Sequence, residues 1–266
     1  MLPDLIAASF SVLRKHKRLI LFPILGAIAA LVVAAVFAGF GGLLSAGNAG
    51  RLRDLGAAAY PFLFAGYLLC AFGVIFFNRA LAACAQECLA GGAPTIGFGL
   101  RRAAGRTGTI FLWAAIYSTV GILLRIIERL VPLAGRIAVW LFGAAWGMAT
   151  YLVVPVLILE DRSAVDSIHR SSQLLRDTWG PQLTASIRLS WRFLLFAIPG
   201  VIVGAIGANY YRPLVALAAV YLVALVTALF AANSIFEVAL YRYAAGDSEH
   251  ADWPRDSMSS AFRPSR

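Results

Sequence analysis

The sequence predicts an all-α membrane protein, a bundle of six transmembrane helices with amphipathic interfacial helices on its cytoplasmic surface. Three observations predict this class. Apolar residues make up 61% of the chain and charged residues only 14%, against roughly 45–50% and about 25% in a soluble domain. Several runs of about 20 mostly apolar residues are long enough to cross a hydrocarbon core roughly 30 Å thick. The charged residues lie in short clusters between these runs.

Residues 1–18 are expected to form an amphipathic helix that lies in the membrane interface. The large apolar residues share one helical face: Leu2, Leu5, Ile6, Phe10 and Leu13. The basic residues that follow should contact anionic headgroups: Arg14, Lys15, Lys17 and Arg18. The apolar stretch after them is much longer than the 7–15 residues of a signal peptide, so an uncleaved first span is expected.

Two apolar runs in the first third of the sequence predict spans one and two, at about residues 19–44 and 57–77. The helix of span two should continue outside the hydrocarbon to Leu89, because Gly91 and Pro94 then break it.

The middle of the sequence predicts spans three and four, at about residues 107–124 and 137–159. A basic segment precedes span three and is expected to contact anionic lipid through three arginines: Arg101, Arg102 and Arg106. Residues 125–136 should form a short amphipathic turn or helix. Pro155 lies within span four, where a proline can free a carbonyl and kink the helix.

Residues 160–180 are polar and should form a second amphipathic helix on the cytoplasmic side. The residues expected on its apolar face are spaced at helical intervals: Val165, Ile168, Leu175 and Trp179.

Two apolar runs near the C-terminal end predict span five at about residues 189–208 and span six at about 213–236, the last helix extending through Tyr243. A single transmembrane domain is therefore expected over residues 1–245. Residues 246–266 are rich in serine, proline and charge, which predicts a disordered cytoplasmic tail.

The basic residues give this six-span arrangement an orientation. The side that holds both termini carries 17 Lys and Arg residues, and the other side carries 6. Because cytoplasmic loops are enriched in Lys and Arg, both termini are expected in the cytoplasm. The net charge of +10 is therefore expected to serve contact with anionic lipid headgroups and not with nucleic acid, whose binding needs one continuous basic surface.

Small residues recur four apart along several spans, which lets helix backbones approach closely in a membrane. The glycines expected to support this packing lie in spans one, four and five: Gly26, Gly143, Gly147, Gly200 and Gly204. We favour packing within one chain, and a homo-oligomer interface is the alternative.

Polar residues are nearly absent from the span centres and collect near the expected cytoplasmic boundary. Six of them form a candidate polar cluster: Asn78, Arg79, Glu160, Asn233, Glu237 and Arg242. One interpretation is a proton or ligand site at the cytoplasmic mouth, in which Glu237 pairs with Arg79 or Arg242. The other is pairing and snorkelling of side chains at helix ends, which requires no function.

The sequence offers no catalytic constellation. The three histidines, His16, His169 and His250, are isolated from one another, and no nucleophile with a base and an orienting group is recognisable. Cys84 and Cys88 share a helix face, but no nearby residues complete a four-ligand metal site. We therefore expect no enzyme activity, no metal and no cofactor.

Three stretches resemble an uncharacterised family of bacterial six-span membrane proteins. They are residues 151–160 with Ser167 and Ser171 after them, residues 239–244, and the Ser-x-x-x-Leu-Arg stretch at Ser9 that leads to Pro23. That family is similar in layout to the membrane domain of some glycerophosphodiester phosphodiesterases. The resemblance implies a fold and a bacterial inner-membrane location, and it implies no reaction because the sequence carries no phosphodiesterase domain.

Two functions remain open from the sequence. The first is a non-enzymatic scaffold or envelope-associated factor that contacts lipids and proteins of the membrane. The second is a small transporter or channel whose path passes the candidate polar cluster.

Overall fold

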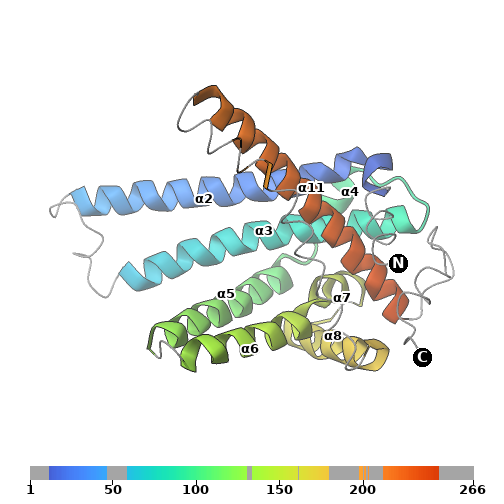
Figure 1. The fold of residues 1–266 in the computed structure, drawn as a ribbon. Helices are drawn as coiled ribbons and strands as arrows, with labels where there is room; N and C mark the ends of the chain where they lie inside the picture. Colours follow the sequence, from blue (N-terminus) through green and yellow to red (C-terminus); the bar gives the residue numbers. More distant parts are fainter. Residues whose placement is uncertain are drawn as a thin grey trace.

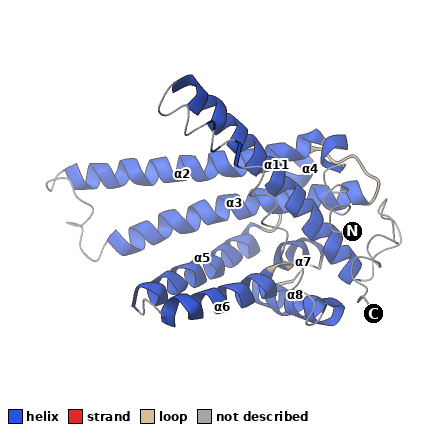
Figure 2. Cartoon of the chain, viewed as in Figure 1, coloured by secondary structure: helices blue, strands red, loops and turns tan. Residues whose placement is uncertain are grey.

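The computed structural model of the chain describes residues 12–46, 59–130, 134–160, 162–179 and 212–245, with residues 198, 199, 201 and 203. Within these ranges the regular elements are helices, and none is a strand (Figure 2). The all-helical prediction is therefore confirmed for the described part of the chain. Outside it lie the tail over 246–266, residues 1–11 of the predicted interfacial helix, and the predicted fifth span apart from residues 198, 199, 201 and 203.

The first two long helices form an antiparallel hairpin (Figure 1). A 3-10 turn, η1 (Lys17–Ile20), leads into α2 (Leu21–Ala46), and α3 (Ala59–Leu89) returns beside it. A Cβ atom added at Gly26 would lie 3.4 Å from the Cβ of Phe77 on α3, so glycine allows the two helices to approach closely.

Helix α3 ends where the sequence predicts. Gly91 has a φ of +86°, a conformation that favours glycine. The N–H of Gly92 donates to the carbonyl of Glu87 and the N–H of Gly91 to that of Cys88, which is the Schellman arrangement. The chain then turns into α4 (Ile96–Ala104), which is capped by the Thr95 hydroxyl accepting from the N–H of Phe98.

The third predicted span forms a longer helix than expected. Helix α5 covers Thr107–Leu130 and α6 covers Ala134–Thr150. The prediction of a separate turn or helix over residues 125–136 is wrong for residues 125–130, which continue α5. Helical periodicity does not change at Arg125, so charge alone suggested a boundary there.

The fourth predicted span is interrupted near its end. Helix α6 stops at Thr150, and α7 (Val153–Leu159) follows after a turn at Tyr151 and Leu152. Pro155 has no N–H to donate to the carbonyl of Tyr151, which explains the break. The N–H of Leu152 donates instead to the Ser171 hydroxyl, at 3.1 Å. The expected kink at Pro155 is thus a full interruption.

The Ser163 side chain caps the first turn of helix α8 (Ala164–Trp179). Its hydroxyl accepts from the N–H of Asp166 and donates to the Asp166 carboxylate. The predicted helix is present, but the predicted apolar face is partly wrong because the Val165 side chain is 51% exposed. The buried face of α8 is shifted around the helix from the predicted one, and it includes two serines. Its buried residues are Ala164, Ser167, Ser171, Leu174 and Leu175.

The last described helix, α11 (Arg212–Ala244), crosses the hairpin of α2 and α3 and ends near α7 and α8 (Figure 1). The main core cluster lies where α3, α4, α11 and the residues before α2 meet, and it contains Phe22, Leu81, Cys84, Ile110 and Ile235. Leu13 belongs to this core. Its side chain therefore packs against protein, although the sequence predicted that it faces the membrane interface.

Five helical segments of the described residues are long and apolar enough to span a membrane. Many of their large apolar side chains are exposed, for example Leu31, Val36, Trp140, Val220 and Val223. Apolar surface of this extent is typical of a protein whose solvent is lipid. The chain is therefore a membrane protein, and most of the predicted fifth span falls on residues that are not described.

Candidate functional site

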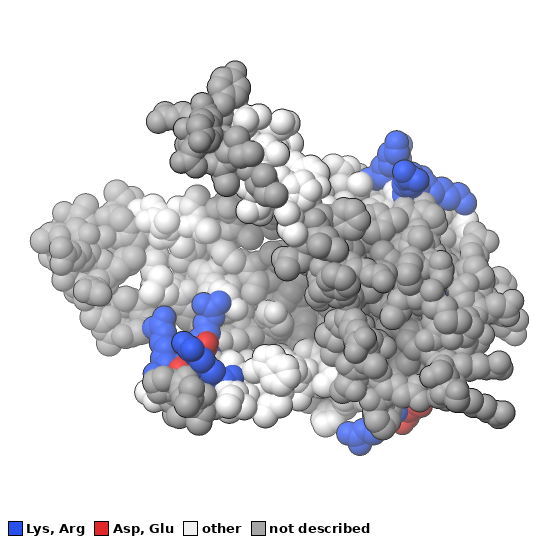
Figure 3. Space-filling model, in the orientation of Figure 1, with Lys and Arg blue, Asp and Glu red and all other residues white. Residues whose placement is uncertain are grey.

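Basic side chains gather at the end of the bundle where α4 and η1 lie. Figure 3 shows one such group over η1 and a second group at the far ends of α5 and α6. Leu19 of η1, Leu89 of α3 and Ala103 of α4 belong to one core cluster, which places the basic segments beside them at a common end. Six of the seven cations predicted to contact lipid are exposed there, and the seventh, Arg106, is half-buried. The exposed six are Arg14, Lys15, Lys17, Arg18, Arg101 and Arg102.

Arg79 differs from these exposed cations because it is buried. It is 1% exposed and lies on α3 directly before the alanine-rich stretch that packs in the core. None of its three guanidinium nitrogens has a hydrogen-bond partner among the residues that the structure describes. An ionised group in such a position lacks the compensation that buried charges usually have.

A cavity of about 140 Å³ lies against Arg79. Two further arginines line it, Arg102 from α4 and Arg106 from the turn before α5, together with aliphatic side chains of α3, α4 and α7. No acidic residue is among its described lining residues. The described lining residues therefore carry three positive charges, and Arg79 lies at the buried side of the cavity because Arg102 is exposed and Arg106 half-buried.

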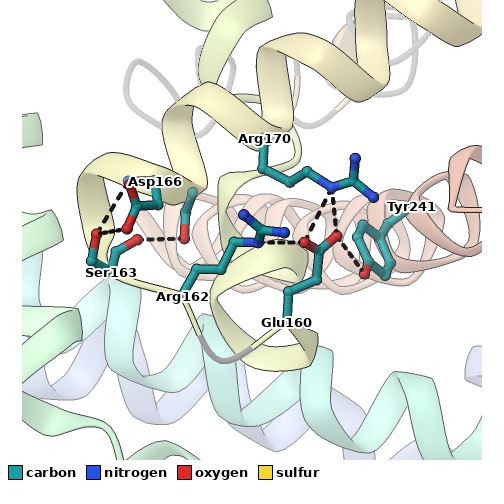
Figure 4. A network of polar contacts seen from close by, with 7 residues as sticks. Glu160, Arg162, Ser163, Asp166, Arg170 and Tyr241 are labelled. Carbon is teal, nitrogen blue, oxygen red and sulfur yellow. Dashed lines mark hydrogen bonds and ion pairs between the residues drawn. The ribbon is translucent and has the colours of Figure 1, made fainter.

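A second polar site joins α7, α8 and α11 around Glu160 (Figure 4). Its carboxylate accepts from the Nε of Arg170 at 2.9 and 3.1 Å, from the Nε of Arg162 at 2.6 Å and from the hydroxyl of Tyr241 at 3.0 Å. The Glu160 side chain is 14% exposed. One carboxylate thus connects the end of α7 to both neighbouring helices.

Two opposing effects set the pKa of Glu160. Partial burial disfavours the charged form, while hydrogen bonds from Arg170, Tyr241 and Arg162 favour it. The hydrogen bonds prevail, and the pKa lies below its ordinary value of 4.5. Glu160 is therefore a charged structural connector at neutral pH and not a proton donor.

The other members of the candidate polar cluster form separate local contacts. Asn78 accepts a hydrogen bond from the hydroxyl of Ser234, which joins α3 to α11. Glu237 accepts from the side-chain amide of Asn233 one turn earlier, at 2.7 Å. The expected pairing of Glu237 with Arg79 is therefore wrong. Arg242 is buried near the end of α11.

The predicted packing glycines differ in their surroundings. Gly26 contacts α3 as described above, whereas a Cβ atom at Gly143 or Gly147 would meet nothing within 4 Å among the described residues. Gly200 and Gly204 lie outside the described residues. The expectation of packing within the chain therefore holds at Gly26 and has no contact to support it in α6.

The sequence did not predict the hydrogen-bond partners of Glu160. Arg170 and Tyr241 lie 10 and 81 residues from Glu160, and no periodic signal relates them. The serines of α8 carried a usable signal, because Ser167 and Ser171 lie four apart in a helix otherwise rich in charge. Serines at that spacing are typical of a face that packs closely against another helix.

Comparison with known proteins identifies the family to which the chain belongs. The sequence pattern of DUF6159, a family of unknown function, matches residues 57–253, which is more than half of the chain. The chain belongs to this family. The family's range contains Arg79, Arg102, Arg106 and Glu160 and begins after the basic cluster at residues 14–18.

No curated protein and no solved structure matches the chain. The resemblance expected from the sequence is thus supported as far as a family of unknown function with membrane-like helices. The expected similarity to the membrane domain of glycerophosphodiester phosphodiesterases has no support among these matches.

Proposed function

We propose that this DUF6159 protein is a non-enzymatic inner-membrane protein that binds anionic lipid headgroups with the basic end of its helical bundle. In this role it acts as a scaffold or envelope-associated factor. The observation that carries the proposal is the set of exposed cations at one end of the apolar helices, on α4 and over η1, where Figure 3 shows a basic group. Each Lys or Arg near an anionic leaflet contributes about 1 kcal/mol of attraction.

Spin-labelled lipids in proteoliposomes test this proposal. We expect the protein to restrict spin-labelled phosphatidylglycerol more than phosphatidylcholine. This preference should fall steeply when salt rises from about 0.1 to about 1 M, because the Debye length shortens from about 10 to about 3 Å. Replacing the four cations of residues 14–18 by glutamine should reduce it strongly.

The matched control changes three exposed arginines at the other end of α5 and α6 to glutamine: Arg125, Arg129 and Arg136. This variant should keep the preference in vesicles whose anionic lipid is confined to the leaflet at the η1 end. Equal restriction of both lipids by the natural protein, or a preference insensitive to salt, would refute the proposal.

A small transporter or channel is the alternative. The observation that favours it is the interruption of the fourth span at Tyr151 and Leu152, since transporters commonly use broken helices. Ion flux into proteoliposomes that is lost in Glu237→Gln would support this alternative over a scaffold role.

A further inference from the structure

The cavity at Arg79 combines two features that call for an anion. The guanidinium group of Arg79 is buried without a hydrogen-bond partner among the described residues. Arg106 lines the same cavity and lies close enough for the two like charges to act on each other. Burial of the Arg79 guanidinium group without a partner is costly, and a bound anion that contacts both arginines would offset that cost.

The shape and donors of the cavity restrict which anion fits. Its volume of about 140 Å³ exceeds the roughly 10–15 Å³ that one water molecule requires, yet it is small compared with pockets of about 300–1,000 Å³ that hold drug-sized ligands. Three arginines surround it. Guanidinium groups are planar forks that bind phosphate oxygens two at a time. A phosphate group offers enough oxygens for several forks, whereas a carboxylate offers two.

We propose that this cavity is a phosphate-binding site. Arg79 is the innermost donor, and Arg102 and Arg106 contact the same group nearer the surface. A phosphate monoester suits it best, because it carries a charge of about −1.5 to −2 at pH 7. The phosphate comes from a lipid headgroup or from a soluble phosphate. The lipid source rests on the proposed function, which places this end of the bundle among headgroups.

Calorimetric titration of the detergent-purified protein with inorganic phosphate tests the site. We expect saturable binding that weakens at least about tenfold in Arg79→Met and in Arg102→Gln, because each change removes charge-assisted hydrogen bonds. Arg102 is exposed, so its variant should fold even where Arg79→Met does not. The matched control is Arg101→Gln, which removes the same charge from the preceding residue of α4 without touching the cavity.

Short-chain lipids below their micelle concentration identify the source. Dihexanoyl phosphatidic acid has a phosphate monoester, and dihexanoyl phosphatidylglycerol has a diester. If phosphatidic acid competes with inorganic phosphate and binds more tightly, the phosphate in the cavity belongs to a lipid headgroup. If phosphatidic acid and inorganic phosphate bind with equal affinity, the ligand is a soluble phosphate. Absence of saturable phosphate binding, or equal weakening in Arg101→Gln and Arg102→Gln, would overturn the site and leave a water-filled cavity.

The same variants separate this inference from the proposed function. Arg79→Met should keep the salt-sensitive preference for phosphatidylglycerol, because the exposed cations of residues 14–18 are unchanged. Loss of phosphate binding with that preference intact supports the cavity as a distinct site. Phosphate binding by a protein that shows no lipid preference would refute the proposed function and leave the cavity assigned to a soluble phosphate.

Discussion

Replacing Gly99 by alanine should destabilise the protein by about 3 kcal/mol, the upper end of the usual range for an overpacked core. A Cβ atom at this position would lie 2.5 Å from the carbonyl oxygen of Ala80 and 2.6 Å from the Sγ of Cys84. The first contact is with backbone, so no side-chain rotation relieves it. Helix α4 would have to move away from α3, which would also open the arginine cavity.

Thermal unfolding in detergent, followed by a thiol-reactive dye, measures this effect. Cys84 is buried against Gly99, so its labelling reports loss of the contact between α3 and α4. Gly97→Ala is the matched control, because among the described residues its Cβ would meet only the Thr95 hydroxyl, at 3.9 Å. That change should be neutral or stabilising by up to about 1 kcal/mol. Equal unfolding temperatures for the two variants would show that α4 does not pack on α3 as described.

Replacing Glu160 by glutamine should cost about 1–3 kcal/mol, because an amide cannot accept all the hydrogen bonds that converge on the carboxylate. The loss of stability stays modest because the side chains of Arg162 and Arg170 are 46% and 32% exposed and remain partly solvated. The loss should appear as a lower unfolding temperature and as faster proteolysis around α8. Arg162→Gln is the control and should change stability by less than about 0.5 kcal/mol.

The pH dependence of the free energy of unfolding tests the role of Glu160 independently. Its folded pKa lies below the ordinary value of 4.5, so the unfolded chain binds more protons in that range. Its contribution is fully present above pH 4.5 and is lost as the pH falls through the folded pKa. Glu160→Gln should lose this part of the acid sensitivity. An unchanged acid profile would contradict the assigned role of the carboxylate.

Local signals in the sequence predicted the long helices well, because each contains an apolar run long enough to span a membrane. The end of α3 followed from Gly91, whereas Pro155 predicted only a kink and the helix is interrupted before α7. The extent of α5 was predicted poorly, since arginine and glutamate continue a helix as readily as they end one. The buried face of α8 was also predicted poorly, because Ser167 and Ser171 are polar residues that are nevertheless buried against the neighbouring helices.

The sequence predicted which polar residues belong to the candidate site, but it did not predict which side chains contact one another. Arg79 and Glu160 were singled out as polar groups near one boundary, and each lies in a defined environment there. Their surroundings depend on tertiary contacts between helices far apart in the chain, such as Tyr241 on Glu160. Gly99 carried no signal at all, since only the closeness of α3 makes its missing side chain necessary.

We propose that the helices span the membrane with the basic end in the cytoplasm, and the membrane topology of the chain tests this most directly. Reporter domains fused after Gly50 and after Ser248 should lie on opposite sides, with the Ser248 fusion in the cytoplasm. Signals from both fusions on the same side, or a Ser248 fusion outside the cytoplasm, would contradict the claim.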